Sequence, residues 1–268
     1  MFGKWSCFAL VSCAFSASTI AECPSAILAA DIDVFPSAKS VPENLLRFYI
    51  YFPRQMSMNL EASDIKLFDV DGREVMQVFV PMRFELWSSD RRRLTLLLDP
   101  GRVKTGLIAH ETLGRALVSG ERYTLEIPDS LTDSEGCALG EGASYSFKVT
   151  AADEEPPSPD SWQIDVPEAA TKSMLSIDLG SPHDHLSMAY RIRILNPDGD
   201  PVAGKISLAE NESVWTFQPR EVWTSSAYRI TVDPRLEDLA GNRPGRLFDR
   251  VANSEIEDRV EELMFFPR

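Results

Sequence analysis

The chain has 268 residues, of which 41 are acidic and 27 basic, so its formal net charge is -14. Hydrophobic residues make up 44% and charged residues 25%, a composition that suits packed domains and excludes wholesale disorder. The acidity argues against nucleic acid or an anionic membrane surface as the main partner, because phosphate binding needs a basic face.

The first 21 residues have the three-part pattern of a secretory signal. Lys4 is the only charge, an apolar or small stretch follows, and Ala21 ends it with small residues at the expected cleavage site. Residues 1–21 are therefore expected to be removed on export to the periplasm, the cell surface or the exterior. An alternative stays open, because the four residues that end in Cys13 resemble a lipobox. A membrane is expected as a partner only if Cys13 is lipidated.

Cleavage after residue 21 leaves Cys23 and Cys137 in the chain. Two cysteines in an exported protein can form one disulfide, which here would tie the N-terminal segment to a loop of the first domain. The alternative of two unpaired thiols stays open, because a disulfide depends on geometry that a sequence does not contain. No CxxC pair or Cys/His cluster occurs, which argues against a structural zinc site.

Short runs of alternating apolar and polar residues predict half-buried β-strands in both halves of the chain. The runs 46–52, 145–149, 175–179 and 191–194 all follow this period of two. Turn signals separate the runs at short intervals, as they do in β-sandwiches. The pattern predicts an all-β fold of two tandem antiparallel sandwiches.

A proline-rich acidic segment at 151–161 divides the two halves. It holds three prolines and four acids and no large apolar residue, so it is expected to be an extended, solvated linker. The predicted domains are therefore 31–150, with an insertion at 101–119, and 162–250. The tail 251–268 is acidic and ends in an apolar patch, which is expected to dock on the second domain or on a partner.

An internal repeat relates the two predicted domains. Each copy has a strand that begins with tyrosine, an aspartate in the following loop and a glycine three residues later: Tyr123, Asp133 and Gly136, then Tyr228, Asp238 and Gly241. We expect the tyrosine hydroxyl to reach a backbone carbonyl, as in the tyrosine corner of Ig-like sandwiches. The aspartate should accept backbone N–H groups, and the glycine should allow a left-handed turn into a closing strand through Phe147 or Phe248.

The second copy resembles a known kind of domain. Residues 228–242, a Tyr-x-Ile-x-Val strand that leads into Asp-x-x-Gly-Asn, resemble the C-terminal signature of bacterial surface-layer-type Ig-like domains, and residues 36–52 resemble the first strand of such domains. The first copy departs from the signature, since Cys137 replaces the asparagine. The resemblance covers most of residues 31–250. It implies two tandem Ig-like domains in an exported protein with a structural, adhesive or spacer role.

Two groups of residues have types that can bind metals. His183 and His185 would share one face of a strand, but no third ligand is near in sequence, and a solvated turn is the favoured interpretation. Calcium prefers six to eight oxygens, and two Asp-Gly hairpins offer several without EF-hand spacing. Their carboxylates belong to Asp69, Asp71, Asp198 and Asp200. Ordinary tight turns are favoured there, and no cofactor is expected.

Other residues raise alternative functions. A glycosidase needs two facing carboxylates, and the candidates in the sequence are Glu111, Glu135, Glu237 and Asp238. Exposed tryptophans can stack on sugars, although buried ones are commoner, and the candidates outside the signal are Trp87, Trp162, Trp215 and Trp223. The insertion 101–119 is expected to pack back on the sandwich or form a short helix, and a ligand-contacting role is the alternative.

The features together favour an exported, non-enzymatic structural or binding module of the cell envelope, with envelope proteins or glycans as partners. The alternative is a carbohydrate-binding or adhesion protein that uses Trp87 or Trp223 and the insertion 101–119. A secreted hydrolase built on scattered acids is the third hypothesis. No nucleophile, phosphate-binding or metalloprotease motif occurs in the sequence.

Overall fold

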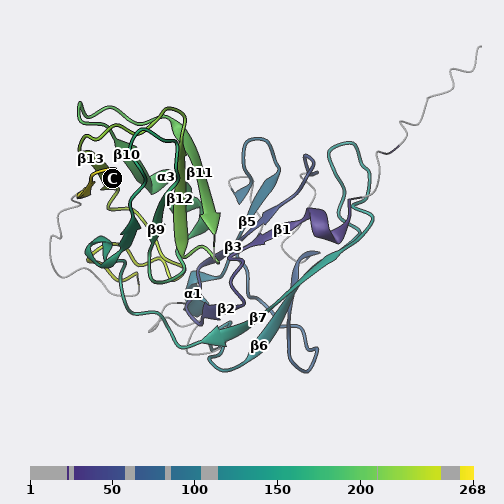
Figure 1. Cartoon of the computed structure of the whole chain (residues 1–268). Helices are drawn as coiled ribbons and strands as arrows, with labels where there is room; N and C mark the ends of the chain where they lie inside the picture. The colour runs from purple at the N-terminus through teal and green to yellow at the C-terminus, as the bar shows by residue number, and fades with distance from the viewer. Residues whose placement is uncertain are drawn as a thin grey trace, which may run out of the picture.

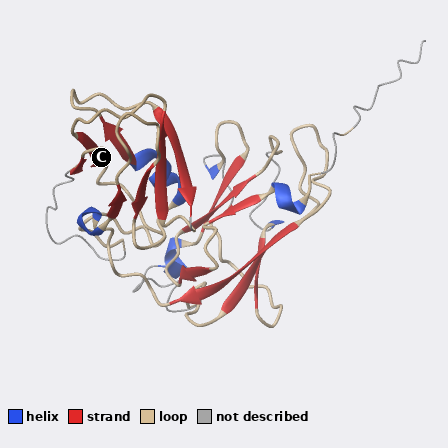
Figure 2. Ribbon diagram, in the orientation of Figure 1, coloured by secondary structure: helices blue, strands red, loops and turns tan. Residues whose placement is uncertain are grey.

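Strands dominate the computed structural model, which describes residue 23 and residues 27–57, 64–81, 86–103, 114–209, 211–248 and 260–268. Buried apolar side chains form two clusters, one almost entirely before the segment 151–161 and one after it. Figure 1 shows the two resulting domains next to each other, and Figure 2 shows that helices are few and short in both. The predicted all-β fold of two β-sandwich domains is confirmed.

Domain 1 encloses its core between two sheets. The first sheet has the order β1 (Asp33–Phe35), β3 (Arg47–Tyr51) and β5 (Arg93–Leu97). The second has the order β2 (Ser40–Pro42), β7 (Ala143–Thr150), β6 (Arg122–Ile127) and β4 (Lys66–Asp69). Strands pair antiparallel except β2 with β7, which run parallel. Lettered in chain order, β1, β3 and β5 match Ig strands A, B and E, and β4, β6 and β7 match C, F and G.

Domain 2 has the strand order of a constant-type Ig domain. One sheet has the order β11 (Gly204–Ala209), β12 (Val214–Pro219), β9 (Leu175–Asp178) and β8 (Gln163–Asp165). The other has the order β10 (Ile192–Leu195), β13 (Tyr228–Val232) and β14 (Glu261–Phe265). Lettered A to G in chain order, these are an ABED and a CFG sheet. The fold is therefore Ig-like from the connectivity of its strands.

Short helices connect or flank the strands. They are η1 (Ala29–Asp31), α1 (Pro100–Val103), η4 (Pro159–Ser161) and α3 (His185–Arg191). Helix α3 links β9 to β10, and Asp184 caps its N-terminus by accepting the backbone N–H of Ser187 at 2.8 Å. The capping aspartate is thereby held at one end of domain 2, where the domain meets domain 1.

Strand β3 departs from its predicted environment on one face. Phe48 and Ile50 are fully buried in the core, as their alternation predicts. The opposite face was expected to lie in water, yet Tyr49 on that face is only 3% exposed, because domain 2 covers it. A period of two indicates that one face meets its own core, but it carries no information about what covers the other face.

The boundary of domain 2 lies further along the chain than predicted. The closing strand is β14, which pairs with β13 from Tyr228↔Phe265 to Val232↔Glu261. Phe248, the expected closing residue, lies outside any strand and packs against the core of domain 1. The prediction that domain 2 ends at 250 is therefore wrong, and the apolar end of the 251–268 tail is its last strand. The first copy closes soon after its glycine, and the sequence offered no reason for a longer connection in the second.

The segment 151–161 joins the two domains and is only partly solvated, whereas its composition predicted full exposure. It contains no strand, but Pro157 and Pro159 are buried. The backbone carbonyl of Asp153 accepts the side-chain amides of Asn44 in domain 1 (2.9 Å) and Asn242 in domain 2 (3.0 Å). The linker is therefore bound to both domains, which limits how far they can move apart.

Candidate functional site at the domain junction

The two copies of the sequence repeat fold into the same loop. In each copy the aspartate Oδ1 accepts the backbone N–H groups two and four residues later, at 3.0 and 2.9 Å for Asp133 and 2.8 and 2.9 Å for Asp238. Gly136 and Gly241 follow with φ of +85° and +79°, the left-handed region that glycine adopts without a steric penalty. The repeat in sequence is a repeat of hydrogen-bonded structure.

The tyrosines of the repeat bond to the loop that precedes their strand. The hydroxyl of Tyr123 accepts the backbone N–H of Val118 at 3.2 Å, and that of Tyr228 accepts the N–H of Thr224 at 3.1 Å. The sequence-based expectation named a carbonyl as partner, whereas the structure has an N–H in both copies. A phenolic oxygen accepts as well as donates, and the position at the start of strand F is that of a tyrosine corner.

The N-terminal segment is attached to the repeat loop of domain 1. Cys23 and Cys137 form a disulfide between residues 114 apart in the chain. Beside it, the N–H of Ile27 donates to the carbonyl of Leu139 at 2.6 Å. Cys137 occupies the position that Asn242 has in the second loop, so the departure from the repeat has a structural use. Cys13 and the predicted signal 1–21 lie outside the described residues.

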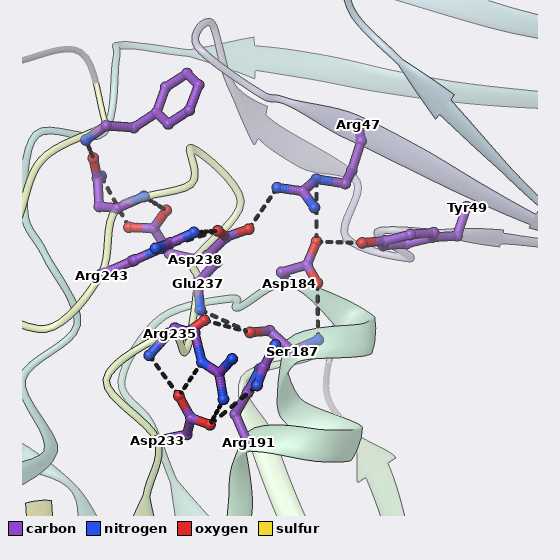
Figure 3. A network of polar contacts seen from close by, with 12 residues as sticks. Arg47, Tyr49, Asp184, Ser187, Arg191, Asp233, Arg235, Glu237, Asp238 and Arg243 are labelled. Carbon is purple, nitrogen blue, oxygen red and sulfur yellow. Dashed lines mark hydrogen bonds and ion pairs between the residues drawn. The ribbon is translucent and has the colours of Figure 1, made fainter. Parts of the chain in front are cut away.

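Charged groups from domain 2 surround Arg47 on the outer face of β3 (Figure 3). The guanidinium Nη2 lies 2.5 Å from Glu237 Oε2, and Nε lies 3.6 Å from Asp184 Oδ2. Tyr49, two residues along the same face, donates its hydroxyl to Asp184 at 2.8 Å. Glu237 also pairs with Arg243 at 2.7 Å. One cation of domain 1 therefore lies between two carboxylates of domain 2.

Burial affects the two sides of this ion-pair cluster differently. Burial alone would lower the pKa of Arg47, but Asp184, Tyr49 and Glu237 outweigh it and the pKa is raised, so Arg47 stays charged. Burial raises the pKa of Asp184, and Arg47 opposes that shift. Removing one member of a buried ion pair leaves the other charge uncompensated, which makes such a contact costly to break.

A second contact inserts a carboxylate of domain 2 into a corner of domain 1. Glu212 lies in the turn between β11 and β12, with φ of 62°. Its carboxylate accepts the backbone N–H of Ser37 at 2.8 Å and the hydroxyl of the same residue at 2.7 Å. Only 3% of Glu212 is exposed, and burial raises its pKa. The buried acceptor is satisfied by donors from the other domain, so separation of the domains would break these bonds.

The segment around His183 and His185 is not a solvated turn. His183 is 1% exposed, and the ring of His185 stacks on Phe35 of domain 1 with centroids 3.7 Å apart. Burial lowers the pKa of both histidines to about 4, so both are neutral at pH 7. The prediction of a solvated turn was wrong because it relied on the polar composition of the segment, whereas the burial of the segment comes from the neighbouring domain.

The tip of the second repeat loop packs directly against domain 1. The N–H of Leu46 donates to the carbonyl of Leu239 at 3.0 Å, and the side chain of Leu239 belongs to the core cluster of domain 1. A Cβ on Gly241 would lie 2.2 Å from Leu46 Cδ1, so glycine allows the close approach. Burial, and then Asp153, raise the pKa of Asp238 in this loop to about 7.

The remaining candidate sites have local structural roles where the structure describes them. In the first Asp-Gly hairpin, Asp69 Oδ1 accepts the N–H groups of Asp71 and Arg73. In the second, the side chain of Asn196 accepts the N–H of Asp200 at 2.8 Å. Within the described ranges no group of three or more His, Cys, Asp or Glu side chains is placed to hold a metal ion. Nor does any helix in these ranges have the length and apolar character to cross a bilayer.

The insertion packs back on domain 1 at both described ends. Arg102, which is 6% exposed, donates to the backbone carbonyls of Met76 at 2.6 Å and Gly114 at 3.1 Å. Arg115 pairs with Glu43 at 3.3 Å. Residues 104–113, which include Glu111, lie outside the described residues.

The tryptophans considered for sugar binding are buried or half-buried. Trp215 and Trp223 are 0% and 1% exposed, and Trp162 is 7% exposed. Trp87 is half-buried and packs near Phe52, with ring centroids 6.0 Å apart. Stacking on a sugar needs an exposed ring face, so the hypothesis that Trp223 binds glycans is wrong.

No family model and no curated protein matches the chain. Among solved structures, it is similar to titin domains Z1Z2 in complex with telethonin (13% identity, 72% of this chain and 83% of that one, TM-score 0.20). It is also similar to murine CEACAM1b (12% identity, 75% and 90%, TM-score 0.17). A third is the complex of the mouse coronavirus receptor-binding domain with its murine receptor (13% identity, 75% and 90%, TM-score 0.17). At such TM-scores the fold assignment rests on the strand order of the chain itself.

The sequence did not single out the junction residues Arg47, Tyr49, Asp184 and Glu212. The sequence contained one signal, and it concerns Arg47 and Tyr49. The outward positions of the run 46–52 hold an arginine and two tyrosines, residue types that are enriched in protein interfaces. An aromatic row on a face expected to be solvated is the sequence feature that points to a docked neighbour.

Proposed function

We propose that this chain is exported and serves as a non-enzymatic structural or binding module of the cell envelope. The observation that carries the proposal is the domain junction, where Arg47, Glu212, Glu237 and the linker carbonyl of Asp153 hold two sandwiches together. A joint with this many polar contacts suits a rod-like spacer or a rigid scaffold for binding loops. The surface-layer-type signature of the second repeat is consistent with such a role.

The state of the cysteines supports export. Disulfides persist in oxidising compartments and are rare in the cytosol, and Cys23 and Cys137 are bonded. Two of the four acids considered for a hydrolase, Glu237 and Asp238, have other partners, which supports a non-enzymatic role. Glu237 pairs with Arg47 and Arg243, and Asp238 accepts N–H groups of its own loop.

Cell fractionation combined with intact-mass measurement tests this proposal. The full chain is produced in a bacterial host, and each fraction is analysed under non-reducing conditions. We expect the protein outside the cytoplasm, starting at Glu22 and lighter by two hydrogens than the dithiol form. A lipidated N-terminus at Cys13 would assign it to the membrane surface. Uncleaved, reduced protein confined to the cytosol would contradict the proposal.

A further inference from the structure

The two domains share a pattern of backbone hydrogen bonds at one end of each sandwich. At this end, called the loop end, the loop after strand B (β3 or β9) meets the segment before strand E (β5 or β12) and the repeat loop. Three bonds from the loop after strand B recur with closely similar lengths, between 2.7 and 3.0 Å. In domain 1 they run from Phe52, Met56 and Ser57 to the carbonyls of Arg92, Arg91 and Thr132, and in domain 2 from Leu179, His183 and Asp184 to those of Ser213, Glu212 and Glu237. These bonds define which residues of the two ends are equivalent.

The side chains on this framework differ where domain 2 contacts domain 1. Domain 2 contacts it through three carboxylates, those of Asp184, Glu212 and Glu237. The equivalent positions of domain 1 hold Ser57, Arg91 and Thr132. Two carboxylates are thus replaced by hydroxyl groups and one by a cation. At these three positions, domain 1 therefore has no carboxylate that could pair with an arginine such as Arg47.

The tips of the two repeat loops differ in the same sense. Leu239 and Ala240, which follow Asp238, are buried. The residues that follow Asp133 are Ser134 and Glu135, and both are exposed. The apolar tip that packs on domain 1 therefore has a polar, solvated counterpart at the other loop end.

The sheet face that domain 2 contacts, the outer face of β3 in domain 1, has no equivalent on the aligned strand of domain 2. The two B strands can be aligned by their pairing with strand E. In domain 1, the core residues Phe48 and Ile50 of β3 pair with β5. In domain 2, Leu175 and Ile177 of β9 pair with β12 in the same way. The outward residues Arg47, Tyr49 and Tyr51 then correspond to Met174, Ser176 and Asp178. The outer face of domain 2 has no arginine at the centre of the contact and no aromatic row beside it.

We propose that the chain carries one copy of each of two docking surfaces, the carboxylate-bearing loop end of domain 2 and the outer face of β3 in domain 1. These surfaces bind each other within one chain, so each chain is a discrete two-domain unit and copies do not join head to tail. The loop end of domain 2 fits one kind of partner, a sheet face with Arg47 beside Tyr49 and the Ser37 corner. In each chain its own domain 1 already occupies that end. At the positions compared, all of them within the described residues, the loop end of domain 1 and the outer face of domain 2 lack both halves of the contact.

This inference deepens the proposed function and rests on it for its biological meaning. It assigns the role of a separate spacer or scaffold rather than a subunit of a fibre, which heterologous contacts would produce. Its test is independent of where the protein resides, since association is measured on purified, disulfide-bonded chain. A failure of export would therefore be distinguished from a failure of this inference.

Sedimentation equilibrium of the mature chain from micromolar to near-millimolar concentration tests the absence of head-to-tail contacts. We expect the monomer mass throughout. Growth of the mass with concentration that Arg91→Glu or Met174→Asp reduces would overturn the inference. Growth that neither substitution changes would contradict the discrete two-domain unit, because copies would then associate through other surfaces.

Small-angle scattering tests whether the charges at Arg47 hold the domains together. Arg47→Glu places three like charges together, so we expect a larger radius of gyration than wild type and faster proteolysis within 151–161. Arg122→Glu, an exposed arginine on β6, is the matched control and should change neither. If near-ultraviolet circular dichroism shows that Arg47→Glu has lost its core packing, Glu237→Gln is measured instead. An unchanged radius of gyration in the folded variant would refute the role of these charges.

Discussion

Neighbouring carboxylates of one loop have different roles at the residue scale. Glu237 bridges Arg47 and Arg243, whereas Asp238 accepts backbone N–H groups within its own turn. Both of these candidate catalytic acids therefore have structural partners. The same holds for His183, whose Nδ1 lies 2.8 Å from the carbonyl oxygen of Ser181.

The tyrosine corners predict a small, matched loss of stability. Tyr123→Phe and Tyr228→Phe each leave a backbone N–H without its acceptor, so each should lower the free energy of unfolding by about 1 kcal/mol. Urea denaturation measures the change. Tyr190→Phe is the control, because Tyr190 is 64% exposed and should have no effect. Equal stability of all three variants would argue against the corner.

Asp238 predicts a pH dependence with a defined sign. Its pKa in the folded chain is about 7, above the ordinary 3.8, so the fold prefers the protonated form. Its contribution to stability is fully present below about pH 4 and is lost as the pH rises through 7, with a slope of at most about 1.4 kcal/mol per pH unit. Between pH 5 and 8 the stability of wild type relative to Asp238→Asn should therefore fall.

Urea denaturation across that window tests the assignment. The stability of wild type relative to Asp238→Asn should fall with pH, whereas its stability relative to Asp165→Asn, an exposed control on β8, should stay constant. The lowered pKa values of His183 and His185 act in the opposite direction up to about pH 7, since protonation of either is disfavoured in the fold, and the comparison with Asp238→Asn removes their contribution. A slope in Asp238→Asn as steep as in wild type would assign the pH dependence to other groups.

At the scale of elements, the same loop serves two purposes in the two domains. In domain 1 it carries the disulfide that holds the N-terminal segment, and in domain 2 it packs on the neighbouring domain. The shared backbone is set by the aspartate and the glycine. The loops differ at the position of Cys137 and Asn242, which contact different segments, and at the tip, which is buried in domain 2 and exposed in domain 1.

Gly136 and Gly241 give a matched test of this division. Both have positive φ, so alanine at either costs roughly 1–2 kcal/mol. At Gly136 the space around the added Cβ is open, but at Gly241 it would meet Leu46 of domain 1 at 2.2 Å. Gly241→Ala should therefore be more destabilising, by a further 1–3 kcal/mol or so. Thermal or urea denaturation measures both, and equal losses would mean that Leu46 moves aside freely.

At the scale of the whole molecule, segments distant in the chain meet at a few points. The disulfide joins the N-terminal segment to residue 137, and the linker carbonyl of Asp153 joins the domains through Asn44 and Asn242. Figure 1 shows the strands of domain 2 beside β3 and β1 of domain 1.

Loss of the disulfide should act on domain 1. The bond closes a long loop, so Cys23→Ser with Cys137→Ser should lower the free energy of unfolding of domain 1 by roughly 2–5 kcal/mol. Hydrogen exchange followed by mass spectrometry should show lost protection at residues 137–141 and little change in β9 and β12. Equal loss of protection in both domains would show that they unfold as one unit.

The sequence by itself determined the fold class, the two-domain division and the repeat. Strand alternation, turn signals and the spacing from tyrosine to aspartate to glycine are local properties, and each reports on a residue and its near neighbours. They identified Asp133, Asp238 and both tyrosines, whose bonds are made within a few residues. They also paired Cys23 with Cys137 as one of two alternatives.

Only the tertiary structure decided the junction. The burial of Tyr49, His185 and Glu212 depends on a domain that is distant in the chain, and no periodicity records it. The late position of β14 was hidden for the same reason, because its partner β13 lies nearly thirty residues earlier. Contacts within a strand or turn depend on residues that are close in sequence, whereas contacts between domains depend on how two complete surfaces fit together.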